Sequence, residues 1–237
     1  MRPVNDVHSP SIPPGSSGTA PAASPAGEGQ TLIIDHPLAV HRLSGLRDVH
    51  TANAGFRQLV DELSTFVAYE ALRDLGTVSR RIDTPVATGV WTPRVDEMVL
   101  LVPVLRAGLG MVPAIQAALP VTEVAHVGLR RDETTLEADV YLNRLPADLT
   151  GRRVVVCDPM LATGGSLAQV CDMVKDRQAR TVTVLCLIAS VPGLSFFRSH
   201  HPDVGVACVA VDPELDERGF IVPGLGDAGD RLFGPPD

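Results

Sequence analysis

Lysine is almost absent from this sequence of 237 residues: of its 20 basic residues, only Lys175 is a lysine and the rest are arginines. Any bound anion must therefore be held by arginine side chains or backbone amides. Acidic residues outnumber basic ones by 28 to 20, which gives a formal net charge of −8. Sequence-independent binding to nucleic acid depends on Lys and Arg that neutralise phosphates. We therefore expect no nucleic-acid partner.

Long hydrophobic runs and paired cysteines are also missing. The longest apolar stretch, residues 98–105, is far shorter than the roughly 20 residues of a membrane helix, so we expect no membrane partner. The four cysteines form no CxxC pair, which argues against a zinc site. Three of them, Cys157, Cys186 and Cys208, lie in apolar runs and are expected to be small buried hydrophobic residues. This usage fits a reducing, cytoplasmic location.

The first 30 residues differ in composition from the rest of the chain. They are rich in Pro, Ser, Gly and Ala, and they contain no aromatic residue. Such a segment cannot bury enough apolar surface to offset the entropy lost on ordering. We expect residues 1–30 to be a disordered extension that is dispensable for activity. Residues 31–237 have the size of a single domain.

Hydrophobic periodicity predicts an α/β fold with a mainly parallel sheet flanked by helices. Continuous apolar runs indicate strands that are buried on both faces, and helical segments separate them. The expected strands are 99–104, 123–129, 153–157, 181–189 and 204–211. The expected helices are 52–75, 112–119, 166–177 and 194–200. The polar segment 130–141 interrupts this pattern and is expected to be a protruding hairpin.

The segment VVVCDPMLATGGS, residues 154–166, has the strongest pattern. A hydrophobic strand leads into Asp158, then a loop of small residues, then a helix. Loops at the carboxyl ends of parallel strands bind ligands, and glycines at a helix start allow close approach of an anion to free N–H groups. Local chemistry leaves two interpretations open, an anion-binding loop and an ordinary turn between strand and helix. No lysine lies near the loop, so it is not a P-loop.

Two further segments are candidates for ligand binding. Arg106 lies in the small-residue loop of VPVLRAGLG, residues 102–110, where an arginine suits a polyphosphate but can equally be an exposed surface residue. The stretch GFIVPGLGDAG, residues 219–229, is too rich in Gly and Pro for a helix or central strand. Its apolar residues indicate a docked segment rather than a loose tail. A rigid loop of this kind can read the edge of a small planar base through its backbone.

These motifs resemble the uracil phosphoribosyltransferase family, across essentially the whole of residues 31–237. The resemblance rests on IDHPLAVHRL (34–43), YEALRDL (69–75), VPVLRAGLG (102–110), DPMLATGGS (158–166) and FIVPGLGDAGDRLFG (220–234). It implies the type I phosphoribosyltransferase fold, with a protruding hairpin and a C-terminal base-binding loop. It also implies transfer of the 5-phosphoribosyl group from 5-phosphoribosyl diphosphate to uracil, which gives UMP and diphosphate.

The resemblance assigns roles to particular residues. Arg106, Arg131, Asp158 and Asp227 match the catalytic residues. The loop around the sugar phosphate would comprise Asp158, Pro159, Met160, Leu161, Ala162, Thr163, Gly164, Gly165 and Ser166. Arg106, Arg131 and Asp227 would contact the same substrate, and Asp158 its ribose hydroxyls. Uracil would lie against Ile221, Gly226, Asp227 and Ala228, largely through backbone groups.

The resemblance implies partners and cofactors as well. Mg²⁺ would arrive with 5-phosphoribosyl diphosphate rather than on direct protein ligands. Members form homo-oligomers, dimers or larger, and several are activated by GTP, although no motif here marks a GTP site. Two departures stand out: Phe220 replaces a frequent tyrosine, and Arg130, which we expect to be solvated, replaces a frequent aromatic residue. The acidic stretch 212–217 has no ligand spacing and is expected to be a solvated loop.

Two other functions remain as alternatives. The first is an RNA-binding regulator of pyrimidine genes on the same fold, which should carry a basic face. The chain carries eight acidic and two basic residues from position 201 onward, which counts against it. The second is a catalytically silent relative, and the presence of the four catalytic matches counts against that. Another base is compatible with the fold, but the PGLGDAG loop favours uracil.

Overall fold

The structure is a computed structural model that describes residues 29–131 and 138–235. Its centre is an eight-stranded sheet in which five neighbouring strands are parallel, as predicted. These are β1 (Thr31–Ile33), β12 (Gly205–Cys208), β10 (Thr181–Leu185), β8 (Arg153–Cys157) and β4 (Val99–Leu105). Beyond β4 lie β5 (Thr122–Val124) and β6 (Val127–Arg131), which are both parallel to it. The last strand, β7 (Ala138–Asn143), is antiparallel to β6.

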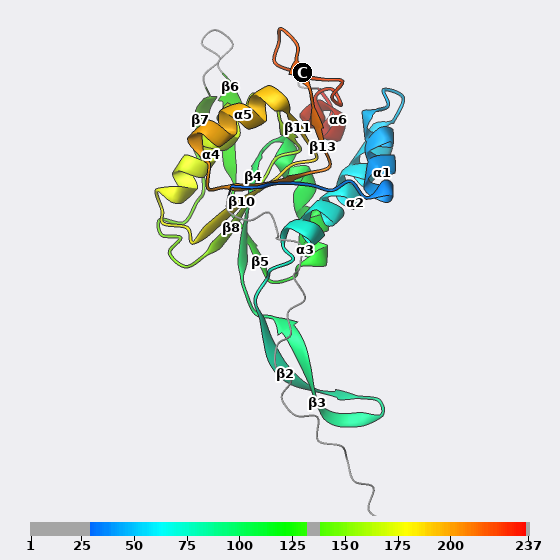
Figure 1. Ribbon diagram of the computed structural model, residues 1–237, viewed down its shortest axis with the longest axis vertical. Helices are drawn as coiled ribbons and strands as arrows, with labels where there is room; N and C mark the ends of the chain where they lie inside the picture. Colours follow the sequence, from blue (N-terminus) through cyan, green and yellow to red (C-terminus); the bar gives the residue numbers. More distant parts are fainter. Residues whose placement is uncertain (1–28, 132–137, 236–237) are drawn as a thin grey trace, which may run out of the picture.

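Helices cover both faces of this sheet (Figure 1). Alternate side chains of one strand point to opposite faces, so Leu101 of β4 joins one core and Leu100 the other. The first core is shared with α1, α2, the 3₁₀ helix η1, α3 and α6, and the second with α4 and α5. The bounds are α1 (Pro37–Arg47), α2 (Asn53–Ala71), η1 (Ala107–Met111), α3 (Val112–Ala118), α4 (Gly165–Lys175), α5 (Val191–His200) and α6 (Ala228–Phe233). Within the described residues, no helix combines the length and apolarity that crossing a membrane requires.

Three of the predicted strands are each divided in two, which corrects their bounds. The run 123–129 gives β5 and β6, and the runs 181–189 and 204–211 each bend from the main sheet into a second one. That sheet contains β9 (Met160–Leu161), β11 (Ile188–Ser190) and β13 (Ala210–Asp212) in the order β13-β11-β9. The bends keep their backbone groups paired: the N–H of Leu187 donates to the Pro159 carbonyl at 2.9 Å. Apolar composition alone does not reveal such a break.

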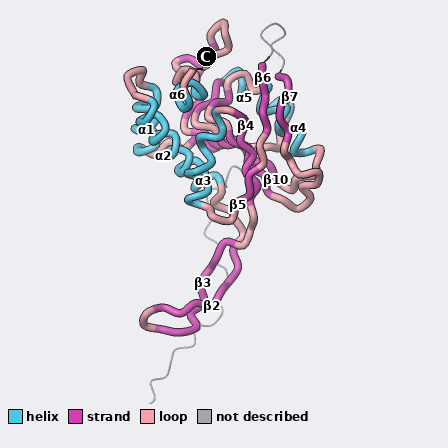
Figure 2. Tube along the Cα trace, turned by 180° about the vertical axis from the view of Figure 1, so that it is seen from behind, coloured by secondary structure: helices cyan, strands magenta, loops and turns pink. Residues whose placement is uncertain are grey.

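A long hairpin follows α2 and was not predicted from the sequence. Its strands, β2 (Thr77–Thr84) and β3 (Ala87–Val95), are antiparallel and extend away from the sheet (Figures 1 and 2). Most of its side chains are exposed, Trp91 among them. The hairpin expected over 130–141 is confirmed by the antiparallel pairing of β6 with β7, while residues 132–137 lie outside the described residues.

Candidate active site

The loops that follow β4 and β8 lie side by side at the carboxyl edge of the sheet. Pro103 is the partner of Cys157 in the register of these strands, so Arg106 and Asp158 emerge next to each other. The backbone of η1 packs directly on the end of β8: a Cβ on Gly108 would lie 2.1 Å from the Cys157 carbonyl oxygen. The carboxyl edge is where ligands bind in open α/β sheets. Two of the predicted segments therefore meet where a ligand site is expected.

The acid–glycine loop, residues 158–166, ends at the first turn of α4. Gly164 has a φ of +86° and precedes the helix, so it adopts a conformation that favours glycine. Among the described residues, no heavy atom lies within 4 Å of where a Cβ on Gly165 would be. Space is therefore open beside Gly165, the first residue of α4, and the free backbone N–H groups of a helix N-terminus suit an anion.

Ser190 at the end of β11 and Gly193 in α5 hold this loop in place. The Ser190 hydroxyl donates to the Ala162 carbonyl at 2.6 Å and accepts from the Gly193 N–H at 2.9 Å. A Cβ on Gly193 would lie 1.8 Å from the Ala162 carbonyl oxygen, and one on Gly164 would lie 2.6 Å from the Gly193 carbonyl oxygen. The two backbones are thus in direct contact. This packing fixes the loop without any ligand.

Asp158 has an unusual charge state for a carboxyl group. Burial raises its pKa to about 7, the Asp227 carboxylate adds to the rise, and a hydrogen bond from the Met160 N–H, at 3.2 Å, opposes it. The group is therefore close to half protonated at neutral pH. A cation or a hydroxyl donor beside it would favour the charged form.

The C-terminal loop, residues 221–229, begins with β15 (Ile221–Val222), which pairs with β14 (Glu214–Leu215) in a short hairpin. Its Asp227 carboxylate interacts electrostatically with Asp158. The side chains of Ile221 and Ala228 are buried in the core, at 5% and 0% exposure, while Gly226 and Asp227 are exposed. The first two can therefore offer only backbone groups to a ligand.

Arg106 connects the two loops. Its Nη2 lies 3.0 Å from Oδ1 of Asp230 in α6, and its side chain is 50% exposed. The N–H of Asp230 donates in turn to Oδ1 of Asp227 at 2.9 Å. A Cβ on Gly229 would have both the Asp227 carboxylate and the Arg106 guanidinium within 4 Å. The structure thus brings together Arg106, Asp158 and Asp227, three of the four predicted catalytic residues.

Other predicted residues are placed less completely. Arg131 is the last residue of β6, and its side chain lies outside the described part of the structure. Arg130 is solvated as expected: its side chain is 77% exposed and lies 4.0 Å from Asp139. The Phe220 ring is half-buried, with the Arg218 guanidinium 5.0 Å from its centre. The ring thus packs against an arginine of its own turn.

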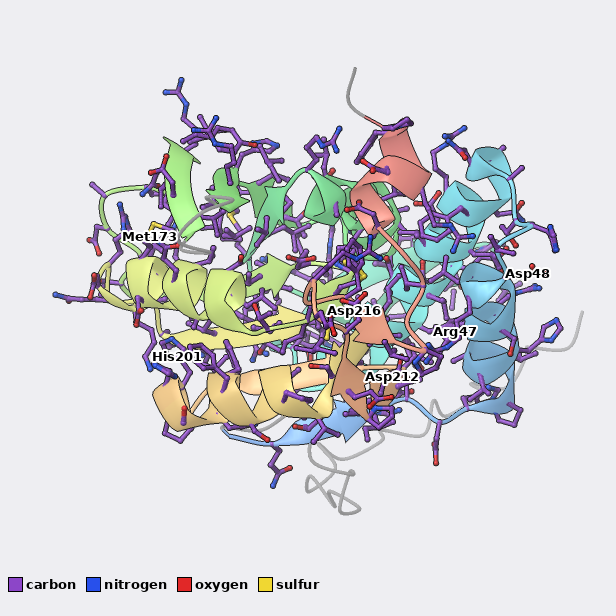
Figure 3. The ribbon with its side chains drawn as sticks, turned by 90° about the horizontal axis from the view of Figure 1, so that it is seen from above. Arg47, Asp48, Met173, His201, Asp212 and Asp216 are labelled. Atoms are coloured by element: carbon purple, nitrogen blue, oxygen red, sulfur yellow. The ribbon has the colours of Figure 1, made fainter. Side chains whose placement is uncertain are left out.

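The prediction that 212–217 is a solvated loop is wrong for Asp212. This residue ends β13 and is only 5% exposed. Its carboxylate forms a bidentate ion pair with Arg47 at the end of α1, with distances of 2.6 and 2.7 Å (Figure 3). Arg231 of α6 lies nearby in the chain fold and donates to the carbonyls of Leu46 and Leu225. No spacing in the sequence marks these contacts, because their partners are far apart in the chain.

The carboxylates of the site suit a magnesium ion that arrives with a substrate. In the described ranges, no three His, Cys, Asp or Glu side chains cluster as a metal site would require. Mg²⁺ is commonly held by one or two carboxylates together with substrate phosphates and waters. Asp158 and Asp227, which interact electrostatically, provide such a pair of carboxylates.

The parallel sheet, the acid–glycine loop at its carboxyl edge and the neighbouring antiparallel hairpin define a type I phosphoribosyltransferase fold. The model of the family described as uracil phosphoribosyltransferase matches residues 33–235. The chain belongs to this family.

Individual relatives agree over almost their whole length. The uracil phosphoribosyltransferase of Kineococcus radiotolerans is 50% identical over 205 residues, which cover 85% of this chain and 97% of the relative. That of Shouchella clausii is 45% identical over 206 residues, 87% of this chain and 99% of the relative. Among solved structures, the AQ2163 protein from Aquifex aeolicus has a TM-score of 0.81 at 33% identity, and the match covers 86% of this chain and 98% of that one.

Proposed function

We propose that this protein transfers the 5-phosphoribosyl group of 5-phosphoribosyl diphosphate to uracil, forming UMP and diphosphate in pyrimidine salvage. The observation that carries the proposal is the proximity of two loops of different chemistry, whose Asp158 and Asp227 carboxylates interact electrostatically. The acid–glycine loop presents a helix N-terminus that suits a phosphate. The C-terminal loop beside it presents exposed backbone at Gly226 and Asp227 that suits a base edge. Arg106, paired with Asp230, joins them.

The residues support the reaction by positioning and charge rather than by a protein nucleophile. The bond between the anomeric carbon and the diphosphate oxygen breaks, the uracil nitrogen bonds to the opposite face of that carbon, and the proton of that nitrogen passes to the departing diphosphate or to water. Arg106, half exposed beside the site, can turn from Asp230 to the diphosphate and stabilise the charge that develops there. Asp158 can accept hydrogen bonds from the ribose hydroxyls. Mg²⁺ bound to the diphosphate would neutralise part of its charge.

The test is formation of UMP from uracil and 5-phosphoribosyl diphosphate with Mg²⁺. Cytosine and hypoxanthine serve as control bases, and parallel reactions contain EDTA or GTP. We expect turnover with uracil alone and loss of turnover with EDTA. A rate increase with GTP would support GTP activation. A folded protein that turns over none of the three bases would refute the proposed function and direct the next test to RNA binding.

We further propose that the protein acts as a homo-oligomer, at least a dimer. The β2–β3 hairpin exposes Ile82, Val86, Val90 and Trp91, and a two-stranded hairpin on its own is only marginally stable in water. Contact with a second copy would bury these side chains. Light scattering coupled to size-exclusion chromatography measures the mass in solution, and we expect Trp91→Ser to lower it. A monomeric mass for the unsubstituted protein would contradict this assembly.

A further inference from the structure

Both backbone polar groups of Gly224 are bonded to one ion pair. Oδ2 of Asp212 accepts from the Gly224 N–H at 3.0 Å, and Nη1 of Arg47 donates to the Gly224 carbonyl at 2.8 Å. The same Arg47 guanidinium donates hydrogen bonds to both carboxylate oxygens of Asp212. Arg47 and Asp212 are 165 positions apart, and they come from the end of α1 and the end of β13. The C-terminal loop is thus tied to two elements that do not belong to it.

The hydrogen bonds to Gly224 lie at a sharp turn of the loop. Gly224 has a φ of +60°, and a Cβ there would lie 2.0 Å from the Ile221 carbonyl oxygen. The chain therefore doubles back between Ile221 and Gly224, just before the exposed residues Gly226 and Asp227. Glycine-rich backbone has many accessible conformations, so the bonds to Gly224 select one of them. A second arginine, Arg231, donates to the carbonyls of Leu225 and of Leu46, the residue next to Arg47.

The ion pair is placed to support the loop rather than to meet a ligand. Asp212 is buried, and the side chain of Arg47 is 23% exposed. Within the described residues, the Arg47 guanidinium donates hydrogen bonds to Asp212 and Gly224. Figure 3 shows Arg47 and Asp212 turned toward each other between α1 and the C-terminal segment. A shift of about 1 Å in a positioning group is enough to weaken binding or catalysis strongly.

We propose that the Arg47–Asp212 ion pair is a positioning element that sets the affinity of the protein for the base, through Gly224 and without touching the base. The proposal rests on the proposed function, because it takes the C-terminal loop to be the base site. Charge-assisted, bidentate bonds are well suited to this role, since they fix direction as well as distance. Lysine at position 47 keeps the charge but loses the fork that reaches Asp212 and Gly224 together.

The test compares Arg47→Lys and Arg47→Met with a matched control, Arg153→Lys. Arg153 also forms a bidentate pair, with Asp74 at 2.8 and 3.0 Å, but at the end of β8 opposite the acid–glycine loop. We expect Arg47→Lys to raise the KM for uracil about tenfold, as for the loss of a charge-assisted hydrogen bond, with a change below about twofold in the KM for 5-phosphoribosyl diphosphate. Arg47→Met should have a larger effect. Arg153→Lys should lower the melting temperature and leave both KM values unchanged.

A second readout does not depend on turnover. Hydrogen–deuterium exchange of peptides covering residues 220–227 should be faster in Arg47→Lys and unchanged in Arg153→Lys. The positioning proposal is overturned if Arg47→Lys leaves exchange unchanged, or if it alters the two KM values equally. Failure of the proposed function looks different: the unsubstituted protein would then not convert uracil at all, whatever the exchange shows. Because Arg47→Lys keeps a positive charge beside the buried Asp212, it should fold, and the test stands even if Arg47→Met does not fold.

Discussion

In the acid–glycine loop, backbone packs on backbone, whereas in the C-terminal loop arginine side chains hold the backbone from outside. The first loop has Ala162 and Gly164 in direct contact with Gly193, at spacings that exclude any Cβ. The second loop depends on two arginines. Arg47 donates to the Gly224 carbonyl and the Asp212 carboxylate, and Arg231 donates to the Leu225 carbonyl. The difference matches the proposed ligands. A phosphate is bound by a fixed set of N–H donors. A loop that recognises a base through its backbone needs those backbone groups held in one position and left accessible.

The largest effect is expected where backbone contact leaves no space. Gly193→Ala would place a Cβ 1.8 Å from the Ala162 carbonyl oxygen. The loop must then shift, so we expect a loss of about 2 kcal/mol or more in the free energy of unfolding. Binding of 5-phosphoribosyl diphosphate, measured by calorimetry, should disappear.

Gly165→Ala is the matched control for this substitution. Its Cβ would enter open space in front of α4 rather than a packed backbone. We expect an unchanged melting temperature together with weaker binding of 5-phosphoribosyl diphosphate, because the methyl group occupies the proposed phosphate site. If Gly193→Ala left both stability and binding intact, the contrast between the two loops would be lost.

Arg106 tests the connection between the loops. Arg106→Ala removes the cation expected to stabilise the leaving diphosphate, and loss of one such donor lowers kcat by about 10²–10³-fold. We expect a fall of that size in kcat/KM with an unchanged melting temperature, since the side chain is half exposed. Asp230→Asn releases the same arginine from its partner without removing it, and it should keep most of the activity. Normal kcat/KM for Arg106→Ala would refute the assignment.

The carboxyl group of Asp158, in the acid–glycine loop, should make the stability of the protein depend on pH. Burial raises its pKa to about 7, above the roughly 3.9 of an unfolded Asp. The folded protein therefore holds a proton that the unfolded chain releases, and the stability due to this group is complete below about pH 4 and lost as pH rises through about 7.

Denaturant unfolding of the unsubstituted protein and Asp158→Asn measures this effect. Relative to Asp158→Asn, the unsubstituted protein should lose up to about 1.4 kcal/mol per pH unit between about pH 4 and about pH 7. Parallel pH profiles for the two proteins would mean that Asp158 is ionised throughout. Burial would then not raise the pKa of Asp158 in the folded protein.

Both loops could be placed from the sequence, but the contacts that hold them could not. A strand followed by Asp158 and then by glycines at a helix start predicts a ligand loop from local pattern alone. The brace at Gly224 depends on Arg47 and Asp212, 165 positions apart, and local pattern contains no such information. The same limit explains the divided strands: the run 181–189 contains no Gly, Pro or charged residue, so its passage from one sheet to another after Leu185 leaves no trace in the composition.

The β2–β3 hairpin was missed for the opposite reason. Strand patterns are recognised by an apolar face that alternates with a polar one, and this hairpin has few buried residues. Arg80, Arg81, Asp83 and Arg94 make the segment 77–95 look like a polar connection. Only the cross-strand register shows that it is paired.

The smallest effect is expected at Arg130, on the edge of the β6–β7 hairpin and outside both loops. Its side chain is 77% exposed and lies 4.0 Å from Asp139, and exposed pairs of this kind contribute about 0–1 kcal/mol. Arg130→Ala should therefore change the free energy of unfolding by less than about 1 kcal/mol, and kcat/KM should stay nearly unchanged because the side chain is solvated. Arg131→Ala is the matched variant, because the family resemblance assigns Arg131, and not Arg130, to the diphosphate. A large loss of kcat/KM for Arg131→Ala alone would make the β6–β7 hairpin a third part of the site. It would differ from the two loops, which are held by backbone packing and by arginine side chains. Equal losses for both variants would instead indicate a broad positive surface on the hairpin that acts on the substrate at a distance.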